Sequence, residues 1–463
     1  MNMVTVRVML VIMIQRKNAR AWQYDVESAY CTADSKRELY AHWAPGKCPP
    51  HERNTCLRVW KALYGVIDSG RCYYEEWVEY HLLLGFQTIH HDQCYMILVV
   101  LKDNEYTAGS QKNDFISFCF HVDDNIVTQE GKELFEWYTL ELKKKYKFVL
   151  SPLHSCMGSN FDIDYEAGTI LISQPNQIER MLRDLGYDDS LRLAKSPVSS
   201  KAQPSMLDIG QKDLQNPTWH GHKFKMQAHI GHLNYIQQGS HPEISWALKI
   251  ASKFSTVFGE NQIKWVKHIV RYLKGAKRAG IMLRRIPESL HWMLQIFTDA
   301  SHAGDPDTRR SISGCVIKLQ GSTVFWKSCF QKIVSHSSTE SELMSLDTGA
   351  TTGQFMMWVV QAMGAVPKMP IEIFVDNTST IDISTNPIQP GRNLHVHARY
   401  FYVRDCVLDG TYVIRHVGTH DQVADILVTY KDYPNFAKML QLLLGVAYIK
   451  EEDGRFGWVV VFL

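Results

Sequence analysis

The sequence of this 463-residue chain lacks several features that mark common classes of protein. Its ten cysteines include no Cys-x-x-Cys pair and nothing suggests a secretory route, so we expect reduced thiols and no disulfide framework. The formal net charge is only +2. Any affinity for a polyanion must therefore come from local clusters of charge and not from the global field.

Long apolar runs are also missing. The run at residues 3–14 is too short to span a bilayer, it contains Arg7, and no small-residue cleavage site follows it. We therefore expect a buried helix or strand there, with no membrane role and no secretion. With 45% hydrophobic and 21% charged residues, the chain should fold into two or three globular domains, each with its own core.

The order of the periodic segments predicts an α+β or α/β protein. Residues 1–187 mix short strand-like runs with helices. Residues 188–290 hold a polar stretch broken by prolines, which is the best linker candidate, and then a helical region. Residues 291–430 contain three strands followed by alternating helices and strands, an order that predicts a mixed sheet covered by helices. Two of these helices are expected at residues 395–408 and near residues 421–427. Residues 431–463 are expected to form a C-terminal tail.

Two adjacent acids interrupt the alternating apolar pattern of residues 115–127. The pattern predicts a tight hairpin with Asp123 and Asp124 at its tip. Adjacent carboxylates repel each other, and a divalent cation would neutralise them; a solvated turn is the alternative. Asp25, on an expected strand, supplies a third acid. Three such acids suit two metal ions that join a nucleoside triphosphate to a primer 3′-hydroxyl, and a nearby Tyr30 ring could exclude a 2′-hydroxyl unless it is a core tyrosine.

Four further acids occur where predicted strands stop or helices start: Asp299, Glu342, Asp376 and Asp425. If they converge on one sheet, they could hold two divalent ions that activate water for phosphodiester hydrolysis. Each also has a structural interpretation. Thr339 and Glu342 match a capping box, Asp376 could cap a helix, and Asp425 could lie on the surface.

A basic stripe is predicted on the helix near residues 264–278, because its five cations recur at spacings of three and four with apolar residues on the other side. The cations are Lys264, Lys267, Arg271, Lys274 and Arg278. A solvated face is the ordinary interpretation, and contact with nucleic-acid phosphates is the alternative.

Taken in order, these motifs resemble the reverse transcriptase and ribonuclease H parts of Ty1/copia-type retrotransposon Pol proteins. The matching blocks of the first two parts are residues 25–30, 63–65, 121–124 and 272–275. The matching blocks of the third part are residues 299–304, 309–314, 326–328, 337–342, 375–377 and 424–427. A single block would be weak evidence, but this many in family order extend from about residue 3 to residue 430.

The resemblance implies a partial reverse-transcriptase palm with a thumb-like region, a helical connection, and a ribonuclease H-like mixed sheet with flanking helices. It implies an RNA-directed DNA polymerase and a ribonuclease H, each using two Mg²⁺ or Mn²⁺ ions. The implied partners are an RNA template, a DNA primer, deoxynucleotide triphosphates and an RNA–DNA hybrid. The implied location is a cytoplasmic virus-like particle and the nucleus.

The resemblance also assigns roles to the matched residues. Asp25, Asp123 and Asp124 would bind the polymerase metals, and Tyr30 would be the steric gate that favours deoxynucleotides. The ribonuclease H carboxylates would be Asp299, Glu342, Asp376 and Asp425. Glu340 is a close competitor for the role of Glu342.

The sequence departs from the family pattern at several positions. The family's basic fingers precede the segment where this chain begins, so we expect a truncated fingers region. Asp68 stands where the family carries Gln, Gly70 where it carries Pro, and His121 where it carries Tyr. These departures favour an alternative in which the chain is a degenerate remnant that retains only ribonuclease H activity or nucleic-acid binding.

Overall fold

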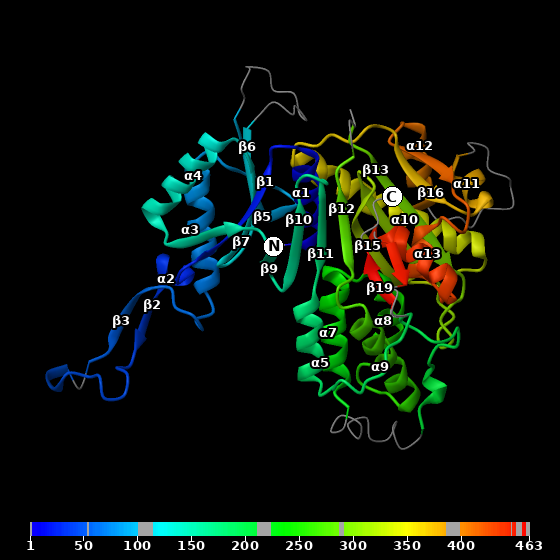
Figure 1. Ribbon diagram of the computed structural model, residues 1–463, viewed down its shortest axis with the longest axis horizontal. Coiled ribbons are helices and arrows are strands. Elements are labelled where there is room, and N and C mark those ends of the chain that lie inside the picture. The colour runs from blue at the N-terminus through cyan, green and yellow to red at the C-terminus, as the bar shows by residue number, and fades with distance from the viewer. Residues whose placement is uncertain are drawn as a thin grey trace. The chain divides into compact units, whose positions relative to one another are not determined.

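The structure, a computed structural model, forms two compact units (Figure 1). Unit 1 comprises residues 1–9 and 18–157, and unit 2 comprises residues 10–17 and 158–463. The residues that it describes are 2–52, 55–100, 114–210, 224–286, 291–385, 399–445, 447–450 and 456–459. No helix in these described ranges is long and apolar enough to cross a membrane.

The apolar run near the N-terminus forms a buried helix, α1 (Met3–Gln15), as one of the two expected alternatives. Val8, Leu10 and Val11 have no exposed surface. Within unit 1, the Cys119 thiol contacts the Met9 sulfur at 4.0 Å and the Thr5 hydroxyl donates to the Asp92 carboxylate at 2.6 Å. The first half of α1 therefore packs against the central sheet of unit 1.

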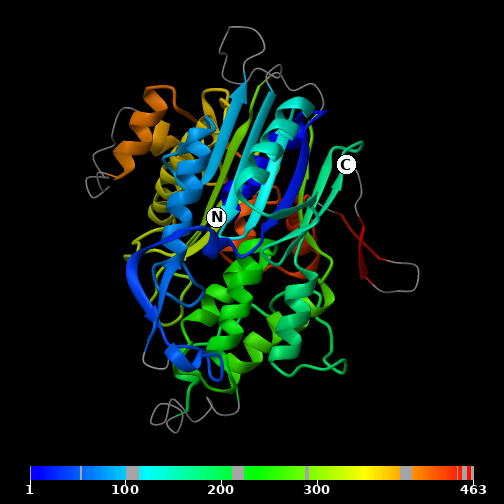
Figure 2. The same cartoon turned by 90° about the vertical axis from the view of Figure 1, so that its left-hand side faces the viewer.

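That sheet has six strands in the order β4-β5-β6-β7-β1-β8. The strands are β1 (Arg20–Val26), β4 (Gln87–Ile89), β5 (Asp92–Val100), β6 (Asp114–His121), β7 (Asp124–Glu130) and β8 (Phe148–Pro152). Helices α3 (Ser69–Leu83) and α4 (Lys132–Lys145) share an apolar core with β1, β6 and β7 (Figure 2). The other described elements of this unit are α2 (Ala29–Thr32), β2 (Asp34–Ala41), η1 (Pro50–Glu52), β3 (Leu57–Lys61) and β9 (Ser155–Cys156).

The core of unit 1 contains a buried chain of polar side chains among its aromatic rings. The Tyr24 and Tyr138 hydroxyls lie 3.1 Å apart, and His81 Nε2 lies 3.1 Å from the Tyr138 hydroxyl. His81 Nδ1 lies 2.8 Å from the Trp77 carbonyl oxygen. Burial lowers the pKa of His81 to about 3, so the ring is neutral at physiological pH.

Unit 2 begins with antiparallel strands that lead into a helical region. Strands β10 (Ser159–Asp164), β11 (Thr169–Ser173) and β12 (Gly280–Arg284) are neighbours in one sheet. Between β11 and β12 the described elements are α5 (Pro175–Asp184), η2 (Met206–Asp208), α7 (Met226–Gly239), η3 (Pro242–Ile244), α8 (Ser245–Ser252) and α9 (Glu260–Gly275). The expected helical region is confirmed.

Within the polar stretch that we expected to be a linker, residues 188–194 are hydrogen-bonded to α9. The Lys274 ammonium donates to the carbonyl oxygens of Asp188 and Asp189 at 3.0 and 2.9 Å. The Ala194 amide donates to the Arg271 carbonyl oxygen at 3.3 Å. Residues 211–223 of the same stretch lie outside the described residues.

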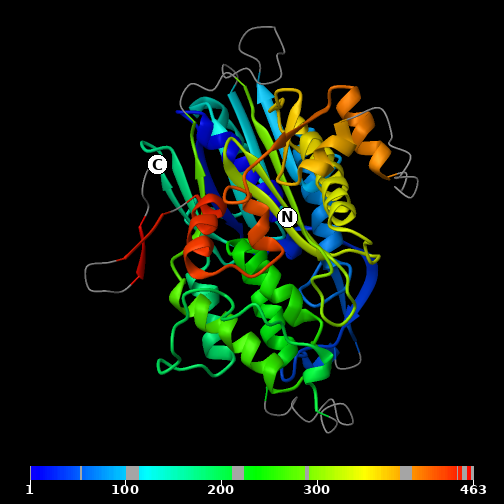
Figure 3. The ribbon, with the colours of Figure 1, turned by 90° about the vertical axis from the view of Figure 1, so that its right-hand side faces the viewer.

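The remainder of unit 2 contains a five-stranded sheet of order β15-β14-β13-β16-β17. Strands β13 (Leu294–Ser301), β14 (Ile312–Leu319) and β15 (Ser322–Phe330) are antiparallel, whereas β16 (Ile371–Val375) and β17 (Tyr412–His416) are parallel to β13 and to each other. This sheet is the predicted mixed sheet. Helix α10 (Ser338–Ala362), drawn in yellow, packs along β13 and β14 (Figure 3).

The C-terminal elements correct one expectation and add detail to another. The helix predicted near residues 421–427 is a short 3-10 helix, η4 (Val423–Leu427). Part of the expected tail is helical, because α13 (Tyr433–Leu444) buries apolar side chains that include Phe436 and Leu440. The other described elements are α11 (Thr378–Thr385), α12 (Arg399–Leu408), β18 (Ala447–Lys450) and β19 (Phe456–Val459). Residues 395–398 of the predicted helix 395–408 lie outside the described residues.

Candidate active sites

The structure brings Asp25, Asp123 and Asp124 together at one end of the unit 1 sheet. Asp25, near the end of β1, is the direct cross-strand partner of Asp124 on β7. The Val26 amide donates to the Asp123 carbonyl oxygen at 3.3 Å. Asp25 is exposed, and the other two acids are half-buried. The cluster is open to solvent and accessible to a ligand.

The hairpin turn lies one residue earlier than the sequence suggested. His121 pairs with Asp124, so the two residues of the turn are Val122 and Asp123, and Asp124 is the first residue of β7. Val122 has a positive φ of 58°, a conformation that a β-branched residue rarely adopts. The buried Asn125 side chain donates to the Asp123 carbonyl oxygen at 2.7 Å and supports this turn. Strand pairing on both sides fixes Asp124, which sequence alternation could not show.

Burial and mutual repulsion raise the pKa values of Asp25 and Asp124. Burial raises the pKa of Asp25, and the charges of Asp123 and Glu27 raise it further. Burial also raises the pKa of Asp124, with further contributions from Asp123 and Asp25. A bound cation would relieve this repulsion, because it favours the ionised form of every carboxylate around it.

Tyr30, on α2, is half-buried and is therefore not a closed core residue. Its ring centroid lies 4.6 Å from that of Tyr64 and 6.3 Å from that of Tyr73. A Cβ atom built on Gly70 would lie 3.4 Å from the Tyr30 hydroxyl, an ordinary contact distance. Two of the sequence blocks singled out above, at residues 25–30 and 63–65, thus meet at one aromatic contact.

The negative charge of Asp68, one of the departures from the family pattern, has a partner. The Arg37 guanidinium on β2 forms an ion pair with the Asp68 carboxylate at the start of α3. Lys36 next to it pairs with Glu75 on the same helix, and Arg71 also pairs with Glu75 at 2.7 Å. These exposed pairs connect the β2–β3 hairpin to α3, and Arg37 compensates the charge that Asp68 introduces.

The four acids of the third part converge in unit 2. Asp299 lies on β13, Glu342 on α10 and Asp376 directly after β16, and each offers an oxygen atom within 4.8 Å of the others. Asp425, on η4, lies close enough to Asp299 for its charge to raise the pKa of that carboxyl. All four line one cavity of about 360 Å³. The structure thus brings these four acids together at one cavity, as the sequence predicted.

Close packing between α10 and β13 brings Glu342 toward Asp299. A Cβ atom on Gly349 would lie 2.2 Å from Thr298 Cγ2, and one on Gly353 would lie 2.2 Å from Ile296 Cδ1. At these two positions, four residues apart on one helix face, a larger residue would force a neighbouring side chain to move, so glycine favours this close approach. The Ser345 hydroxyl donates to the Asp299 carbonyl oxygen at 2.7 Å.

Two buried residues position η4 and with it Asp425. The Gln422 side-chain amide donates to the carbonyl oxygens of Thr298 and Phe374 at 3.0 and 3.3 Å, so it ties η4 to both β13 and β16. Gly314 on β14 leaves room for η4, since a Cβ atom there would lie 2.8 Å from the Ala424 carbonyl oxygen. The sequence carried no signal that distinguished Gln422 from an ordinary polar residue.

The capping role that we considered for Glu342 belongs to other residues. The Ser337 hydroxyl accepts from the Glu340 amide at 3.1 Å, so Ser337 is the N-cap of α10. The Glu340 carboxylate accepts from the His336 amide at 2.6 Å. The interpretation of Thr339 and Glu342 as a capping box is therefore wrong. Glu340 stabilises the helix terminus, and Glu342 is directed into the carboxylate cluster.

Burial and crowding raise the pKa values of three acids in this cluster. Burial and the charges of Glu342, Asp425 and Asp376 raise the pKa of Asp299 well above its ordinary value. Burial and the charge of Asp376 raise the pKa of Glu342 to about 8. Burial raises the pKa of Asp376, although the Thr419 hydroxyl donates to it and opposes the effect. The Glu342 Oε2 atom is buried and has no hydrogen-bond partner among the described residues. Hard oxygen ligands with an unsatisfied buried oxygen fit a divalent ion such as Mg²⁺.

Two of the five cations in the predicted basic stripe have a structural use. Lys274 and Arg271 bind backbone carbonyl oxygens of residues 188–192. Lys264 pairs with Glu260 at 3.5 Å, and Lys267 lies 5.7 Å from the centre of the Phe224 ring. The apolar face is buried as predicted. Arg271 and Lys274 thus serve the packing of unit 2.

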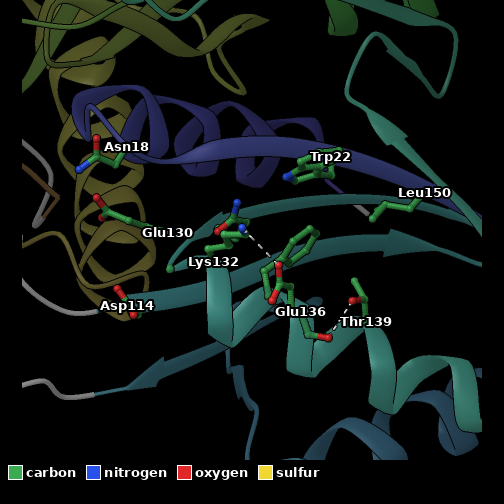
Figure 4. Close-up of a pocket in the computed structure, with 11 residues that line it drawn as sticks. Asn18, Trp22, Asp114, Glu130, Lys132, Glu136, Thr139 and Leu150 are labelled. Atoms are coloured by element: carbon green, nitrogen blue, oxygen red, sulfur yellow. Dashed lines mark hydrogen bonds and ion pairs between the residues drawn. The ribbon is translucent and has the colours of Figure 1, made fainter.

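A second cavity, of about 660 Å³, lies in unit 1 at the opposite end of β6 and β7 from Asp124 (Figure 4). Trp22 and Phe135 form one wall, with ring centroids 5.6 Å apart. Lys132 and Glu136 form an ion pair of 3.8 Å at its edge. None of the predicted site residues lines this cavity.

Comparison with known proteins adds family information to this geometry. Residues 1–198 match the sequence model of the reverse transcriptase (RNA-dependent DNA polymerase) family. The chain is 25% identical to the retrovirus-related Pol polyprotein from transposon TNT 1-94 of Nicotiana tabacum, over 88% of this chain and 29% of that protein. It is 27% identical to the Pol polyprotein from transposon RE1 of Arabidopsis thaliana, over 91% of this chain and 27% of that protein. A Ty1 Gag-Pol polyprotein of Saccharomyces cerevisiae is 21% identical over 88% of this chain and 22% of its own length. The chain spans less than a third of the length of these relatives.

Solved structures similar to the chain include a ribonuclease H1 isolated from compost and a foamy viral protease-reverse transcriptase in complex with double-stranded DNA. The first has 16% identity and a TM-score of 0.24, and covers 29% of this chain and 92% of that chain. The second has 12% identity and a TM-score of 0.21, and covers 86% of this chain and 68% of that chain. The resemblance to Ty1/copia-type retrotransposon Pol proteins is therefore confirmed by sequence: residues 1–198 match the reverse transcriptase family, and most of the chain aligns with retrotransposon Pol polyproteins.

Proposed function

We propose that this chain is the reverse transcriptase and ribonuclease H segment of a retrotransposon Pol protein. Its substrates would be an RNA template with a DNA primer and deoxynucleotide triphosphates, and an RNA–DNA hybrid. The observation that carries the proposal is the convergence of Asp299, Glu342, Asp376 and Asp425 from four separate elements into one cavity. By family, the site of action would be a cytoplasmic virus-like particle and the nucleus.

The proposed domain roles follow the order of the elements. Residues 1–187 would form the reverse transcriptase part, and residues 188–290 the linker and helical connection. Residues 291–430 would form the ribonuclease H part, with 431–463 as a tail. The continuous five-stranded sheet between Leu294 and His416 supports the third assignment.

In the ribonuclease H site, Asp299, Glu342 and Asp376 would hold one Mg²⁺ or Mn²⁺ ion, and Asp425 with Asp299 would hold a second. Such ions supply a nucleophilic water and neutralise charge on the leaving oxygen. The protein holds the ligands in place. The Ala300 amide donates to the Glu342 carboxylate at 3.2 Å, and the Thr419 hydroxyl donates to Asp376 at 3.3 Å. These hydrogen bonds restrict the rotamers of two ligands and so reduce the cost of organising the site.

In the polymerase site, Asp25, Asp123 and Asp124 would hold two ions, which supply charge neutralisation for phosphoryl transfer. The half-buried Tyr30 ring, supported by Tyr64, would contact the sugar of the incoming nucleotide and exclude a 2′-hydroxyl. Its contact with Tyr64 restrains the ring, which a steric gate requires.

A chain that has kept only ribonuclease H activity is the second candidate. It is favoured by the difference between the two clusters. Hydrogen bonds from Ala300 and Thr419 restrain the ribonuclease H acids, whereas Asp25 in the polymerase cluster is exposed.

Paired assays on the purified chain test both candidates. One assay follows extension of a DNA primer on an RNA template, and the other follows cleavage of the labelled RNA strand of a hybrid. Asp376→Asn should abolish hybrid cleavage and leave primer extension intact, and Asp123→Asn should do the reverse. Asp405→Asn, on the exposed face of α12, is the matched control. Cleavage that survives Asp376→Asn would refute the ribonuclease H assignment, and absence of extension by the wild-type chain would favour the second candidate.

A further inference from the structure

Asp425 differs from the other three acids of the ribonuclease H cluster in having a cationic partner. The Lys431 ammonium forms an ion pair with the Asp425 Oδ2 atom. Both side chains are largely buried, with 17% of Lys431 and 9% of Asp425 exposed. Lys431 lies in the loop between η4 and α13, six residues after Asp425. Among the described residues, no such ion pair joins Asp299, Glu342 or Asp376 to a basic side chain within 4.0 Å.

The positions of the carboxylate oxygens also separate Asp425 from the other three acids. Asp299, Glu342 and Asp376 have oxygen atoms close enough to share one ion, and Asp425 is not part of that group. Its carboxylate is directed both to Asp299 and to Lys431. An ion that needs Asp425 as a ligand must therefore compete with an ammonium group already in place, whereas an ion between the other three acids meets no such competitor.

We propose that Lys431 is the resident counter-ion of this cluster in the metal-free protein, and that it is displaced from Asp425 when the second ion binds. This inference rests on the proposed two-metal function of the site. Lys431 is thus a positioning residue: it neutralises one of four crowded carboxylates and makes the binding of the second ion weaker than that of the first. An ammonium group is a compact point charge on a flexible stem, which suits a partner that must leave.

Metal titration without nucleic acid tests the role of Lys431, with free and bound Mn²⁺ followed by electron paramagnetic resonance. The ions of the polymerase cluster are identified as those lost in Asp123→Asn. Of the remaining ions, the wild-type chain should bind one Mn²⁺ tightly and a second more weakly. Lys431→Met keeps the length of the stem and removes the charge. It should tighten the second ion by about tenfold or more, as expected for removal of one opposing charge a few ångströms from the ligand, and leave the first nearly unchanged. The metal-free Tm should fall, because the carboxylates lose their counter-ion.

Lys431→Arg provides a second, oppositely directed variant that retains the charge and should fold. A guanidinium can hold a carboxylate through two parallel hydrogen bonds, so this variant should weaken the second ion. Lys438→Met is the matched control, since Lys438 pairs with Asp421 at 2.9 Å in an exposed position of the same region. It should leave both affinities as in the wild type.

The outcomes separate this inference from the proposed function. If wild-type Mn²⁺ binding is absent, or is unchanged by Asp299→Asn, the proposed metal site itself is wrong. If the wild type binds Mn²⁺ through Asp299 but Lys431→Met leaves the second affinity unchanged, or tightens both ions equally, only the role of Lys431 is refuted. A Lys431→Arg variant that binds the second ion as tightly as the wild type or more tightly would also refute it.

Discussion

Gly349 on α10 approaches Thr298 on β13 so closely that a Cβ atom on the glycine would lie 2.2 Å from the threonine Cγ2 atom. Thr298 directly precedes Asp299, and Glu342 lies two turns before Gly349 on the helix. The distance between the helix and the strand therefore determines how near the Glu342 and Asp299 carboxylates come. Any side chain at position 349 acts on the cluster by separating the two elements.

Gly349→Ala should destabilise unit 2 by about 1–3 kcal/mol, the usual cost of overpacking a close contact, and should reduce hybrid cleavage. The measurement is chemical denaturation together with Mn²⁺ affinity. Gly231→Ala is the control, because a Cβ atom there meets nothing within 4 Å in the middle of α7. That variant should gain up to about 1 kcal/mol from helix propensity. Equal effects of the two substitutions would contradict the packing explanation.

Glu342 should make the stability of the metal-free protein fall as pH rises. Its pKa is about 8 in the folded chain and about 4.5 when unfolded, so its contribution is fully present below about 4.5 and is lost as pH rises through about 8. Mg²⁺ should stabilise the protein more at pH 8.5 than at pH 6, since the ion competes with the proton. Thermal unfolding with and without Mg²⁺ at pH 6 and at pH 8.5 measures this difference in stabilisation.

Glu342→Gln should remove most of that pH dependence and most of the Mg²⁺ effect. Glu340→Gln, which alters the neighbouring capping residue, should retain both and lose only some stability through the weakened helix terminus. A Glu342→Gln variant whose Mg²⁺ response still grows with pH would assign the titration to another acid of the cluster.

Asp68→Gln should lower the KM for deoxynucleotide triphosphates in primer extension. The substitution removes a negative charge and leaves the Arg37 guanidinium uncompensated, so that the region becomes more attractive to a polyanion. We expect a change of roughly two- to tenfold that shrinks at high salt, as for a screened surface charge. Glu141→Gln, which breaks the Lys144 pair elsewhere in unit 1, is the control. An unchanged KM would mean that Asp68 is remote from the bound nucleotide.

His81 should make unit 1 sensitive to acid. Its pKa is about 3 in the folded chain and about 6.5 when unfolded, so its contribution is present above about 6.5 and is lost as pH falls toward 3. Hydrogen exchange of the α3 amides at pH 5 and pH 7.5, corrected for intrinsic rates, measures the loss. His81→Phe should flatten this dependence, whereas His154→Phe, at an exposed position, should preserve it.

Much of the fold could be predicted because periodicity reports directly on burial. The strands around Asp25 and Asp299 follow the apolar pattern closely, and so does the parallel strand before Asp376. The positions of these acids at the ends of strands made their convergence foreseeable. The 3-10 character of η4 and the helix in the expected tail were not foreseeable, because both depend on packing against distant strands.

Predictions from local sequence patterns were wrong where two overlapping assignments match the same residues. Ser337 with Glu340 and Thr339 with Glu342 both match a capping box, and only packing of α10 on β13 selects the first. Likewise, Asp124 belongs to β7 and not to the turn, because it pairs with Asp25 and His121. Lys431 gave no sequence signal at all, since its significance lies in a side-chain contact that the fold creates.

The two carboxylate clusters are assembled in different ways, and this should govern how each fails on heating. Asp25 and Asp124 face each other across one pair of strands, so their relation persists as long as that ladder does. Glu342 and Asp425 reach their cluster only because a helix and a short 3-10 turn remain seated on the sheet. If those two elements partly separate from the sheet, the second cluster loses its activity while the sheet itself is still folded. Thermal inactivation of hybrid cleavage should therefore precede the melting of its own domain.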